Sequence, residues 1–272
     1  MPDRKLLRSI KNHRLSLIFL VMGSILVLFT LLTLFNMIFR QLLLDTEGLI
    51  EAAADPVVID SIVLTLYCSF LATLLAAILG TPLAYVLARH DFRGKSIVES
   101  VIDVPVIIPH SVAGIALYAL FMSRSPVGEA FSNIGIVFED SMWGIVVAML
   151  FVSAPFFVNA AMEGFQSINP RLERVARTLG ANQWKSFYRI TLPLAIHHLF
   201  SGAVMAWARG ISEFGAVIII AFYPMIAPIL IFYRFTTHGL KGSQPIAVLL
   251  ILICFVVFII LRTSTKYWGR RK

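Results

Sequence analysis

Six long apolar runs constrain this chain more than any other feature, because such runs must be buried in protein or in lipid. They span residues 15–39, 62–88, 101–122, 142–162, 194–222 and 246–261. A helix crosses the hydrocarbon core of a bilayer with about 20 apolar residues, within a range of roughly 17–25. The last run is slightly short, and the second and fifth are long enough to tilt or to project past the bilayer. We expect six membrane-spanning helices in one compact domain.

Composition agrees with a membrane protein. Hydrophobic residues make up 58% of the 272 residues and charged residues only 14%, whereas about a quarter of the residues of a soluble domain are charged. A helix satisfies all its backbone polar groups internally, as lipid requires, so the expected fold is an all-α membrane protein. The first run is longer than a signal-peptide core and is followed by no small-residue cleavage site, which predicts an uncleaved anchor.

The positive charges predict the orientation of the six helices. The N-terminal tail, the 89–95 connection, the 169–193 segment and the C-terminal tail together hold 18 Lys and Arg residues, against 4 in the other three connections. Cytoplasmic loops of membrane proteins carry this excess. We therefore expect a multi-pass protein of the cytoplasmic membrane, with the 169–193 segment and both termini in the cytoplasm. The net charge of +8 follows from this topology, and we infer no nucleic-acid binding from it.

The 169–193 segment is a basic amphipathic stretch between two apolar runs, and its local signals predict two short helices. Asn169 suits an N-cap and Pro170 the first helical position. Gly180 stands where a left-handed residue would end the first helix. Asn182 can cap a second helix, which we expect Pro193 to end. The first helix would carry one apolar stripe made of Leu172, Val175, Ala176 and Leu179.

Two interpretations of this segment remain open from its pattern. Arg171, Arg174, Arg177, Lys185 and Arg189 would lie on the outside of the helix pair. Such a pair could rest on the lipid headgroups as an interfacial element. It could also be a rigid docking element for a partner in the cytoplasm.

The fifth run contains the charged residues Arg209 and Glu213, four positions apart. On a helix they would share a face, and either ion alone in lipid would cost at least a few kcal/mol. One interpretation is a mutually neutralised pair packed inside the bundle, and the other is a face that borders a substrate path. Gly210 and Gly215 flank the pair and would permit close helix approach or bending.

The third run begins with two prolines, Pro105 and Pro109, which each remove a backbone donor and should bend the helix. Freed carbonyls are tolerated in a membrane only where they are buried in protein or line a cavity. His110 and Ser111 follow and can donate hydrogen bonds. This run is therefore either a kinked packing helix or part of a path. In the fourth run, we interpret Ser153, Pro155 and Asn159 as packing polarity.

Several chemistries have little support in the sequence. Cys68 and Cys254 lie inside apolar runs and suggest neither a disulfide nor a metal site. The neighbours His197 and His198 would point to different helix faces, so we predict no metal site. No Gly-x4-Gly-Lys-Ser/Thr phosphate loop occurs, and no paired carboxylates or nucleophile elbow indicate an enzyme. An ATP-independent secondary anion transporter remains an alternative, for which only Arg209 and Glu213 are plausible coupling residues.

The 169–193 segment resembles the EAA coupling motif of ATP-binding-cassette importer permeases. In that motif Glu-Ala-Ala is followed by Gly and then, after nine intervening residues, by Ile-x-Leu-Pro. Here Gly180 is followed at that spacing by Ile190, Thr191, Leu192 and Pro193. The two alanine positions hold Val175 and Ala176. The usual glutamate position holds Arg174, and Glu173 stands one place earlier, which leaves the role of the motif's carboxylate open.

Further stretches resemble the permease subunits of molybdate, tungstate and sulfate importers. They are IPHSVAGIAL, RTLG, ARGISEFGAV and YPMIAP, and the resemblance runs from about residue 55 to the last span. It implies a type I importer fold, with a first helix at 15–39, a permease core at 57–262, and cytoplasmic tails at 1–14 and 263–272. Molybdate or tungstate is the preferred substrate, and sulfate is the alternative.

The resemblance also implies partners and site residues. The partners are a second copy of the chain, two ATPase subunits that bind ATP and magnesium, and an extracytoplasmic oxyanion-binding protein, with no cofactor or metal in this chain. The residues implied to couple the chain to the ATPase are Leu172, Glu173, Arg174, Val175, Ala176, Leu179, Gly180, Ile190 and Pro193. The residues expected to line the translocation path or its gate are Pro109, His110, Ser111, Gly114, Arg209, Ser212, Glu213 and Gly215.

Overall fold

The computed structural model describes residues 4–269, with side chains described for 15–260, and the described chain is helical without strands. The predicted all-α fold is thus confirmed. The predicted tails, 1–14 and 263–272, fall on residues whose side chains lie outside the described part. In chain order the helices are α1 (Arg4–Leu44), α2 (Thr46–Ala54), α3 (Pro56–Arg89), α4 (Lys95–Ile107), α5 (His110–Phe121), α6 (Pro126–Ser132), α7 (Met142–Ser167), α8 (Arg171–Thr178), α9 (Gln183–Ser186), the π-helical turn η1 (Phe187–Thr191), α10 (Leu192–Ile211), α11 (Val217–Ile220) and α12 (Ala227–Gly269).

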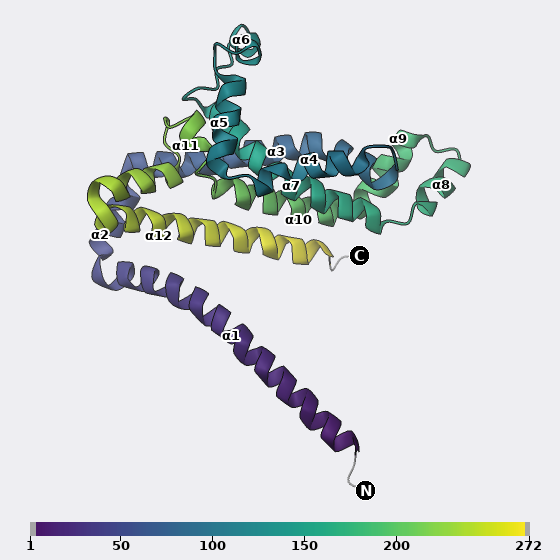
Figure 1. The fold of residues 1–272 in the computed structure, drawn as a ribbon, viewed down its shortest axis with the longest axis horizontal. Coiled ribbons are helices and arrows are strands. Elements are labelled where there is room, and N and C mark those ends of the chain that lie inside the picture. The colour runs from purple at the N-terminus through teal and green to yellow at the C-terminus, as the bar shows by residue number, and fades with distance from the viewer. Residues whose placement is uncertain (1–3, 270–272) are drawn as a thin grey trace.

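The centre of the molecule is a bundle of α3, α7 and α10, which pack side by side along most of their lengths (Figure 1). Small residues make this close packing possible, since Ala76, Ala161 and Ala195 are buried at the contacts. The contact between α3 and α7 is very close at Gly80, where an added Cβ would lie 2.9 Å from the Phe157 ring of α7. The bundle is the rigid part against which the interrupted segments are placed.

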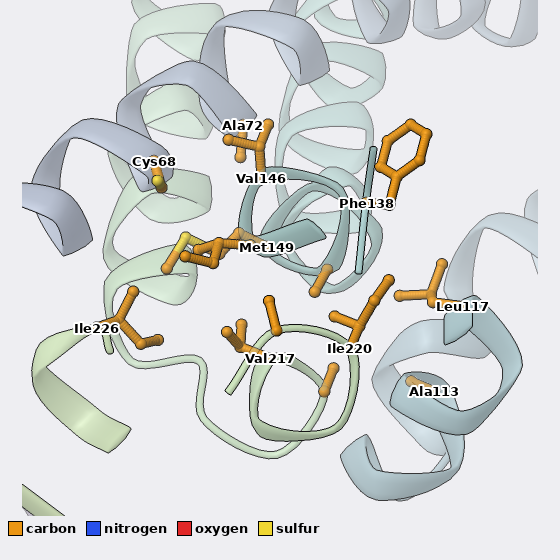
Figure 2. Packing of buried hydrophobic residues seen from close by; sticks show 14 of the residues in the cluster. Cys68, Ala72, Ala113, Leu117, Phe138, Val146, Met149, Val217, Ile220 and Ile226 are labelled. Atoms are coloured by element: carbon orange, nitrogen blue, oxygen red, sulfur yellow. The ribbon is translucent and has the colours of Figure 1, made fainter. Parts of the chain in front are cut away.

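A second buried cluster holds the short helix α11 against α5 and α7 (Figure 2). Val217 of α11 lies toward Met149 of α7, and Ile220 of α11 lies toward Leu117 of α5, with Ala113 in the same cluster. Every one of these side chains is at most 6% exposed. The cluster therefore fixes α5 and α11 against α7, although neither of these two short helices belongs to the central bundle.

The number of spans fits the prediction of six if one bent pair counts as a span. Five helices of the described chain are long and apolar enough to cross a membrane, and α4 with α5 form the bent pair. The break is much sharper than the predicted kink, because the helix axis bends by 112° between α4 and α5. Pro109 explains it: proline disfavours the helical conformation in the preceding residue, and Ile108 is extended at φ −74° and ψ 146°. Pro105, in contrast, lies inside α4.

The predicted fifth span, 194–222, is wrong as a continuous helix. The helix α10 ends at Ile211, residues 212–216 are not α-helical, and α11 follows as one short turn. Pro193 was also predicted to end the second short helix, and instead it lies in the first turn of α10. A proline is tolerated there because the first turn needs no donor from it. The chain passes from α9 through the π-helical turn η1 into α10 without a stop.

The first and last helices extend beyond the predicted runs. The helix α12 starts at Ala227 rather than near residue 246, and it bends at Gly239, where φ is 67°. The apolar part of α1 makes almost no contact with the bundle and projects away from it (Figure 1). Its long exposed apolar surface requires a lipid or protein environment. The segments α8 and α9 lie at one end of the long axis and α2 lies at the other, and α12 runs from the α2 end toward the side of α8 and α9 (Figure 1).

Candidate functional site

Local signals in the 169–193 segment produce the predicted pair of short helices. The Asn169 Oδ1 accepts a hydrogen bond of 2.9 Å from the Arg171 backbone N–H, and the Asn182 Oδ1 accepts one of 2.8 Å from that of Lys185. Gly180 adopts φ 88°, which is the left-handed conformation predicted for it. The two helices therefore meet at a bend that favours glycine.

The apolar stripe of α8 faces away from the rest of the chain. Leu172, Val175 and Leu179 are 46%, 56% and 82% exposed. Ala176 is half-buried, and Arg174 is exposed. Three exposed aliphatic side chains on one short, charged helix are a costly surface in water, so this stripe is available to a partner.

Glu173 is the buried residue of α8, and it ties α8 to the end of α3. The residue is 4% exposed. Its carboxylate accepts hydrogen bonds from the Tyr85 hydroxyl at 3.0 Å, the Arg89 Nε at 2.9 Å and the Thr191 hydroxyl at 2.9 Å. The Arg177 guanidinium lies 3.7 Å from the same group. The Glu173 carboxylate, whose role the sequence left open, thus joins α8, α3 and η1.

The environment of Glu173 keeps its carboxylate ionised. Burial raises its pKa, but the hydrogen bonds from Thr191 and Arg89 and the charge of Arg89 lower it, and the net shift of the pKa is downward. The stabilisation from this shift is present above the ordinary pKa of a glutamate and is lost as the pH falls through the lowered pKa. Tyr85, Arg89 and Thr191 were missed from the sequence, because the first two lie 88 and 84 residues from Glu173.

A second polar cluster lies where two broken spans meet. Pro109 is at the break between α4 and α5, and residues 212–216 form the break after α10. The two breaks approach closely because glycines face them: a Cβ on Gly215 would lie 2.7 Å from the His110 Cβ, and one on Gly114 would lie 2.8 Å from the Ala216 carbonyl oxygen. Both glycines are therefore needed for this contact, and the structure brings the two predicted path segments together.

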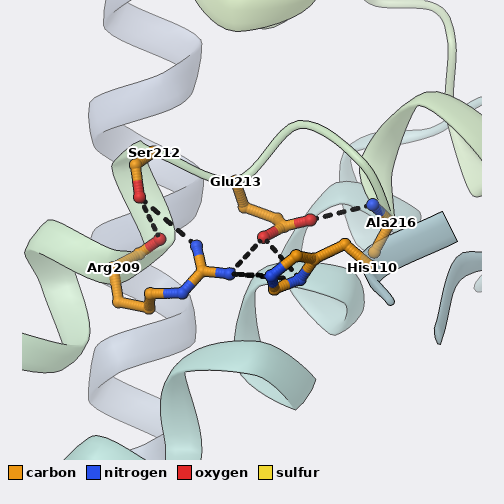
Figure 3. A network of polar contacts seen from close by, with 5 residues as sticks. All are labelled: His110, Arg209, Ser212, Glu213 and Ala216. Carbon is orange, nitrogen blue, oxygen red and sulfur yellow. Dashed lines mark hydrogen bonds and ion pairs between the residues drawn. The ribbon is translucent and has the colours of Figure 1, made fainter. Parts of the chain in front are cut away.

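Glu213 is the centre of this second cluster and is 1% exposed (Figure 3). Its Oε2 accepts a hydrogen bond of 2.9 Å from the Arg209 Nη2 and lies 3.3 Å from the His110 Nδ1. Its Oε1 accepts one of 2.8 Å from the Ala216 backbone N–H. The carboxylate is thus held by donors from α10, α5 and the start of α11.

Arg209 and His110 also contact each other. The Arg209 Nη2 lies 2.8 Å from the His110 Nε2. One neutral tautomer satisfies this geometry, with Nδ1–H donating to Glu213 and Nε2 accepting from Arg209. The Arg209 side chain is 20% and the His110 side chain 40% exposed, so the cluster opens on one side. His110 was not predicted as a partner of the pair, because it lies 99 residues from Arg209.

The Arg209–Glu213 pair exists as predicted, but its geometry is not that of a continuous helix. Helix α10 ends at Ile211, and the Glu213 N–H bonds to the Gly210 carbonyl at 3.0 Å in a tighter turn. Ser212 is exposed, accepts from the Arg209 Nη1 at 3.3 Å and donates to the Arg209 carbonyl at 3.0 Å. Ser111 is exposed at the start of α5. Asn159 donates to Asp103 at 2.8 Å, which agrees with packing polarity in the fourth run.

The sequence predicted no metal or cofactor site in this chain. No group of three or more His, Cys, Asp and Glu side chains suited to a metal ion occurs among the described residues. Both clusters instead consist of one buried carboxylate with several cationic or neutral donors. In both clusters the carboxylate joins separate segments of the chain.

Residues 80–270 match the family described as binding-protein-dependent transport system inner membrane component. The chain is 47% identical to the molybdate/tungstate transport system permease protein WtpB of Pyrococcus furiosus, over 93% of this chain and 96% of the relative. It is 30% identical to the sulfate transport system permease protein CysT of Synechocystis, over 99% and 96%. The protein is therefore a membrane permease subunit of a transport system, and it belongs to the binding-protein-dependent inner membrane component family.

Solved structures support the same fold. A bacterial alginate ABC transporter, in complex with a periplasmic protein that holds an alginate pentasaccharide, matches with a TM-score of 0.72. The match covers 98% of each chain at 22% sequence identity. At this identity the likeness shows the fold of an ABC importer permease and nothing about the substrate.

The Glu173 contacts predict that replacing this carboxylate loosens the 169–193 segment. In Glu173→Gln the charge that neutralises Arg89 is lost, and breaking one side of a buried ion pair costs about 3–5 kcal/mol. We expect trypsin to cleave the segment faster in the folded variant than in the wild type. Glu163→Gln is the matched control, because Glu163 is exposed on α7. Equal cleavage of both variants would show that Glu173 does not hold the segment.

Proposed function

We propose that this chain is the permease subunit of an ATP-driven importer for a tetrahedral oxyanion, and that the ion is molybdate or tungstate. The observation that carries the proposal is the 47% identity, over nearly the whole of both chains, with a molybdate/tungstate permease. The sulfate permease relative, at 30% identity, keeps sulfate as a second candidate. Both candidates require the same machinery in this chain.

The assembly that we propose contains two copies of the chain, two ATPase subunits that bind ATP and magnesium, and an extracytoplasmic binding protein. The family description and the alginate transporter complex support a binding protein and ABC partners for proteins of this kind. The excess of Lys and Arg on the 169–193 segment and in the tails supports a cytoplasmic location for this segment and both termini.

In this assembly α8 and α9 dock into a cleft of the ATPase. The exposed stripe of Leu172, Val175 and Leu179 supplies apolar contact, and the surrounding arginines select the orientation. Ala176 is the half-buried member of the same stripe, and Arg174 borders the stripe on the outside. Gly180 provides the bend, and η1 with Ile190 and Pro193 leads directly into α10. Glu173 then makes α8 move together with α3, so that the movement of the closing ATPase subunits is transmitted to the bundle of α3, α7 and α10.

The broken spans provide the path and its gate. An oxyanion path must present donors without binding tightly, because the anion has to leave again. Pro109 and the segment 212–216 expose polar groups inside the membrane, which is tolerated where they are buried in protein or line a cavity. His110, Arg209 and the Ala216 N–H form a donor set suited to an oxyanion, which the Glu213 carboxylate occupies. The junction of the two broken spans also contains two serines and two glycines, Ser111, Ser212, Gly114 and Gly215.

Elemental analysis tests the substrate. Cells that lack the gene are grown in trace molybdate, in trace tungstate and in limiting sulfate. We expect a selective loss of cellular molybdenum or tungsten, restored when the gene is supplied again. Loss of sulfate uptake alone would mean that the transported ion is sulfate, while the proposed mechanism of the permease would stand. Normal contents of all three elements, in a strain without a redundant importer, would contradict the proposal.

Distorting the bend at Gly180 should uncouple ATP hydrolysis from transport. Gly180 has φ 88° and open space around a new Cβ, so Gly180→Val strains the backbone by about 1–2 kcal/mol without a side-chain clash. Ala176→Asp should also uncouple the two activities, because it places a carboxylate within the apolar stripe. In both variants we expect ATPase activity that no longer rises with loaded binding protein, together with reduced uptake.

The matched control for Gly180 is Gly135, in the connection between α6 and α7. Its φ is 83° and it also has open space, so Gly135→Val imposes the same backbone strain far from the 169–193 segment. Stimulated ATPase activity and uptake should persist in this control. Wild-type coupling in Gly180→Val and in Ala176→Asp would exclude the proposed role of the segment.

Accessibility of Ser111 tests the path. In a chain with Cys68 and Cys254 replaced, Ser111→Cys should react with a charged thiol reagent, and its rate should change with the nucleotide bound to the ATPase. Ser24→Cys is the control, because Ser24 is an exposed serine on the apolar part of α1 and should face lipid, where a thiol does not ionise. If the two cysteines remain equally unreactive in every nucleotide state, Ser111 does not line the path.

A further inference from the structure

Two adjoining pockets lie along the last turns of α3, where α8 and α9 pack against it. The first has a volume of about 300 Å³ and is lined by apolar groups of Pro82, Val86, Trp184 and Phe187. The second has a volume of about 220 Å³, and three arginines contribute to its lining. Tyr85, His90 and Gln183 line both, so the two pockets form one continuous crease.

The arginine-lined pocket carries more positive charge than its own carboxylate neutralises. Arg89, Arg174 and Arg177 line it together with Glu173, which leaves a formal charge of +2. Glu173 is already bound by the Tyr85, Arg89 and Thr191 donors. Arg174 has no ion pair with any described residue. The pocket therefore favours an added anion.

Arg89 gives the second, independent indication of a ligand. Its side chain is 8% exposed, and its Nε donates to Glu173. Its Nη2 is buried and has no hydrogen-bond partner among the described residues. A buried donor of a charged group without an acceptor costs roughly 1–3 kcal/mol or more, so such groups are normally paired in the assembled protein.

The order of the pockets along α3 distinguishes among possible anions. Pro82 and Val86 precede Arg89 on α3, so the apolar pocket lies deeper in the proposed membrane than the arginine-lined pocket. Trp184 lines the apolar pocket and is 69% exposed, and tryptophan is enriched at membrane–water interfaces. A phospholipid of the cytoplasmic leaflet has the same order, because its charged headgroup lies at the cytoplasmic surface and its acyl chains lie deeper in the membrane.

We propose that this crease binds one anionic phospholipid of the cytoplasmic leaflet. Its phosphate lies against Arg89, Arg174 and Arg177, and the first part of an acyl chain lies against Pro82, Val86 and Trp184. The lipid then bridges α3 and α8 beside Glu173 and couples membrane composition to the docking segment. The inference rests on the proposed cytoplasmic location of α8, but not on the identity of the transported ion.

The test measures lipid retained by the full-length chain purified with its ATPase. The complex is delipidated, equilibrated with equal amounts of phosphatidylglycerol and phosphatidylcholine in detergent, and analysed by native mass spectrometry. The wild type should retain phosphatidylglycerol in preference to phosphatidylcholine. The double variant Arg174→Gln/Arg177→Gln should lose this preference by about fivefold for each arginine removed, since each basic residue near anionic lipid contributes about that factor.

Two further variants separate the site from general charge attraction. Arg171→Gln/Arg189→Gln removes the same charge from the same segment outside the pocket and should retain phosphatidylglycerol as the wild type does. Val86→Trp changes no charge but fills the apolar pocket at a side chain that is 43% exposed, and it should also lose the lipid.

Three results would overturn the proposal. Equal retention by the two double variants would mean that the segment attracts anions without a site. Displacement of phosphatidylglycerol by inorganic phosphate would mean that the pocket holds a small anion. Loss of the ATPase, with lipid retention unchanged in Arg174→Gln/Arg177→Gln, would mean that the pocket receives a carboxylate of that subunit. Each readout is independent of whether molybdate is transported.

Discussion

A buried carboxylate has to be held by several donors, and two such carboxylates determine how this structure holds together outside its central bundle. An isolated ion inside a protein or a membrane costs several kcal/mol unless it is paired and hydrogen-bonded. Glu173 meets this requirement with hydrogen-bond donors from α3 and η1, and Glu213 meets it with donors from α10, α5 and the start of α11. Each carboxylate therefore joins segments that lie far apart in the sequence.

The two glutamates stand at opposite functional regions of the proposed transporter. Glu173 joins the docking helix α8 to α3, and Glu213 joins the end of α10 to α5 and α11. The helices α3 and α10 themselves pack against α7 in the same bundle. A displacement of α8 thus has a continuous route through rigid helices to the junction of the broken spans, which is where an oxyanion path would open or close. Discrete ionic contacts of this kind suit a device with two states, because they form or break as a unit.

Much of the fold followed from the sequence where the signals were local. The caps at Asn169 and Asn182 and the left-handed Gly180 were predicted correctly, because each depends on residues within one helical turn. The apolar runs predicted the spans for the same reason. The breaks were less visible: Pro109 produced a sharp turn rather than a kink. Gly210 and Gly215 were predicted to permit bending of the run 194–222, but not to end α10 at Ile211. The partners of the buried carboxylates were not predictable, since Arg89 and His110 lie 84 and 99 residues from Glu173 and Arg209.

ATP-dependent uptake into proteoliposomes is the measurement that tests the central claim most directly. The vesicles would contain this chain with its ATPase, and loaded binding protein would be supplied on the receptor side. We predict accumulation of molybdate or tungstate only when hydrolysable ATP is present on the side of the 169–193 segment, with sulfate a weaker competitor. Accumulation without ATP, or with ATP confined to the opposite side, would contradict both the mechanism and the orientation proposed for this permease.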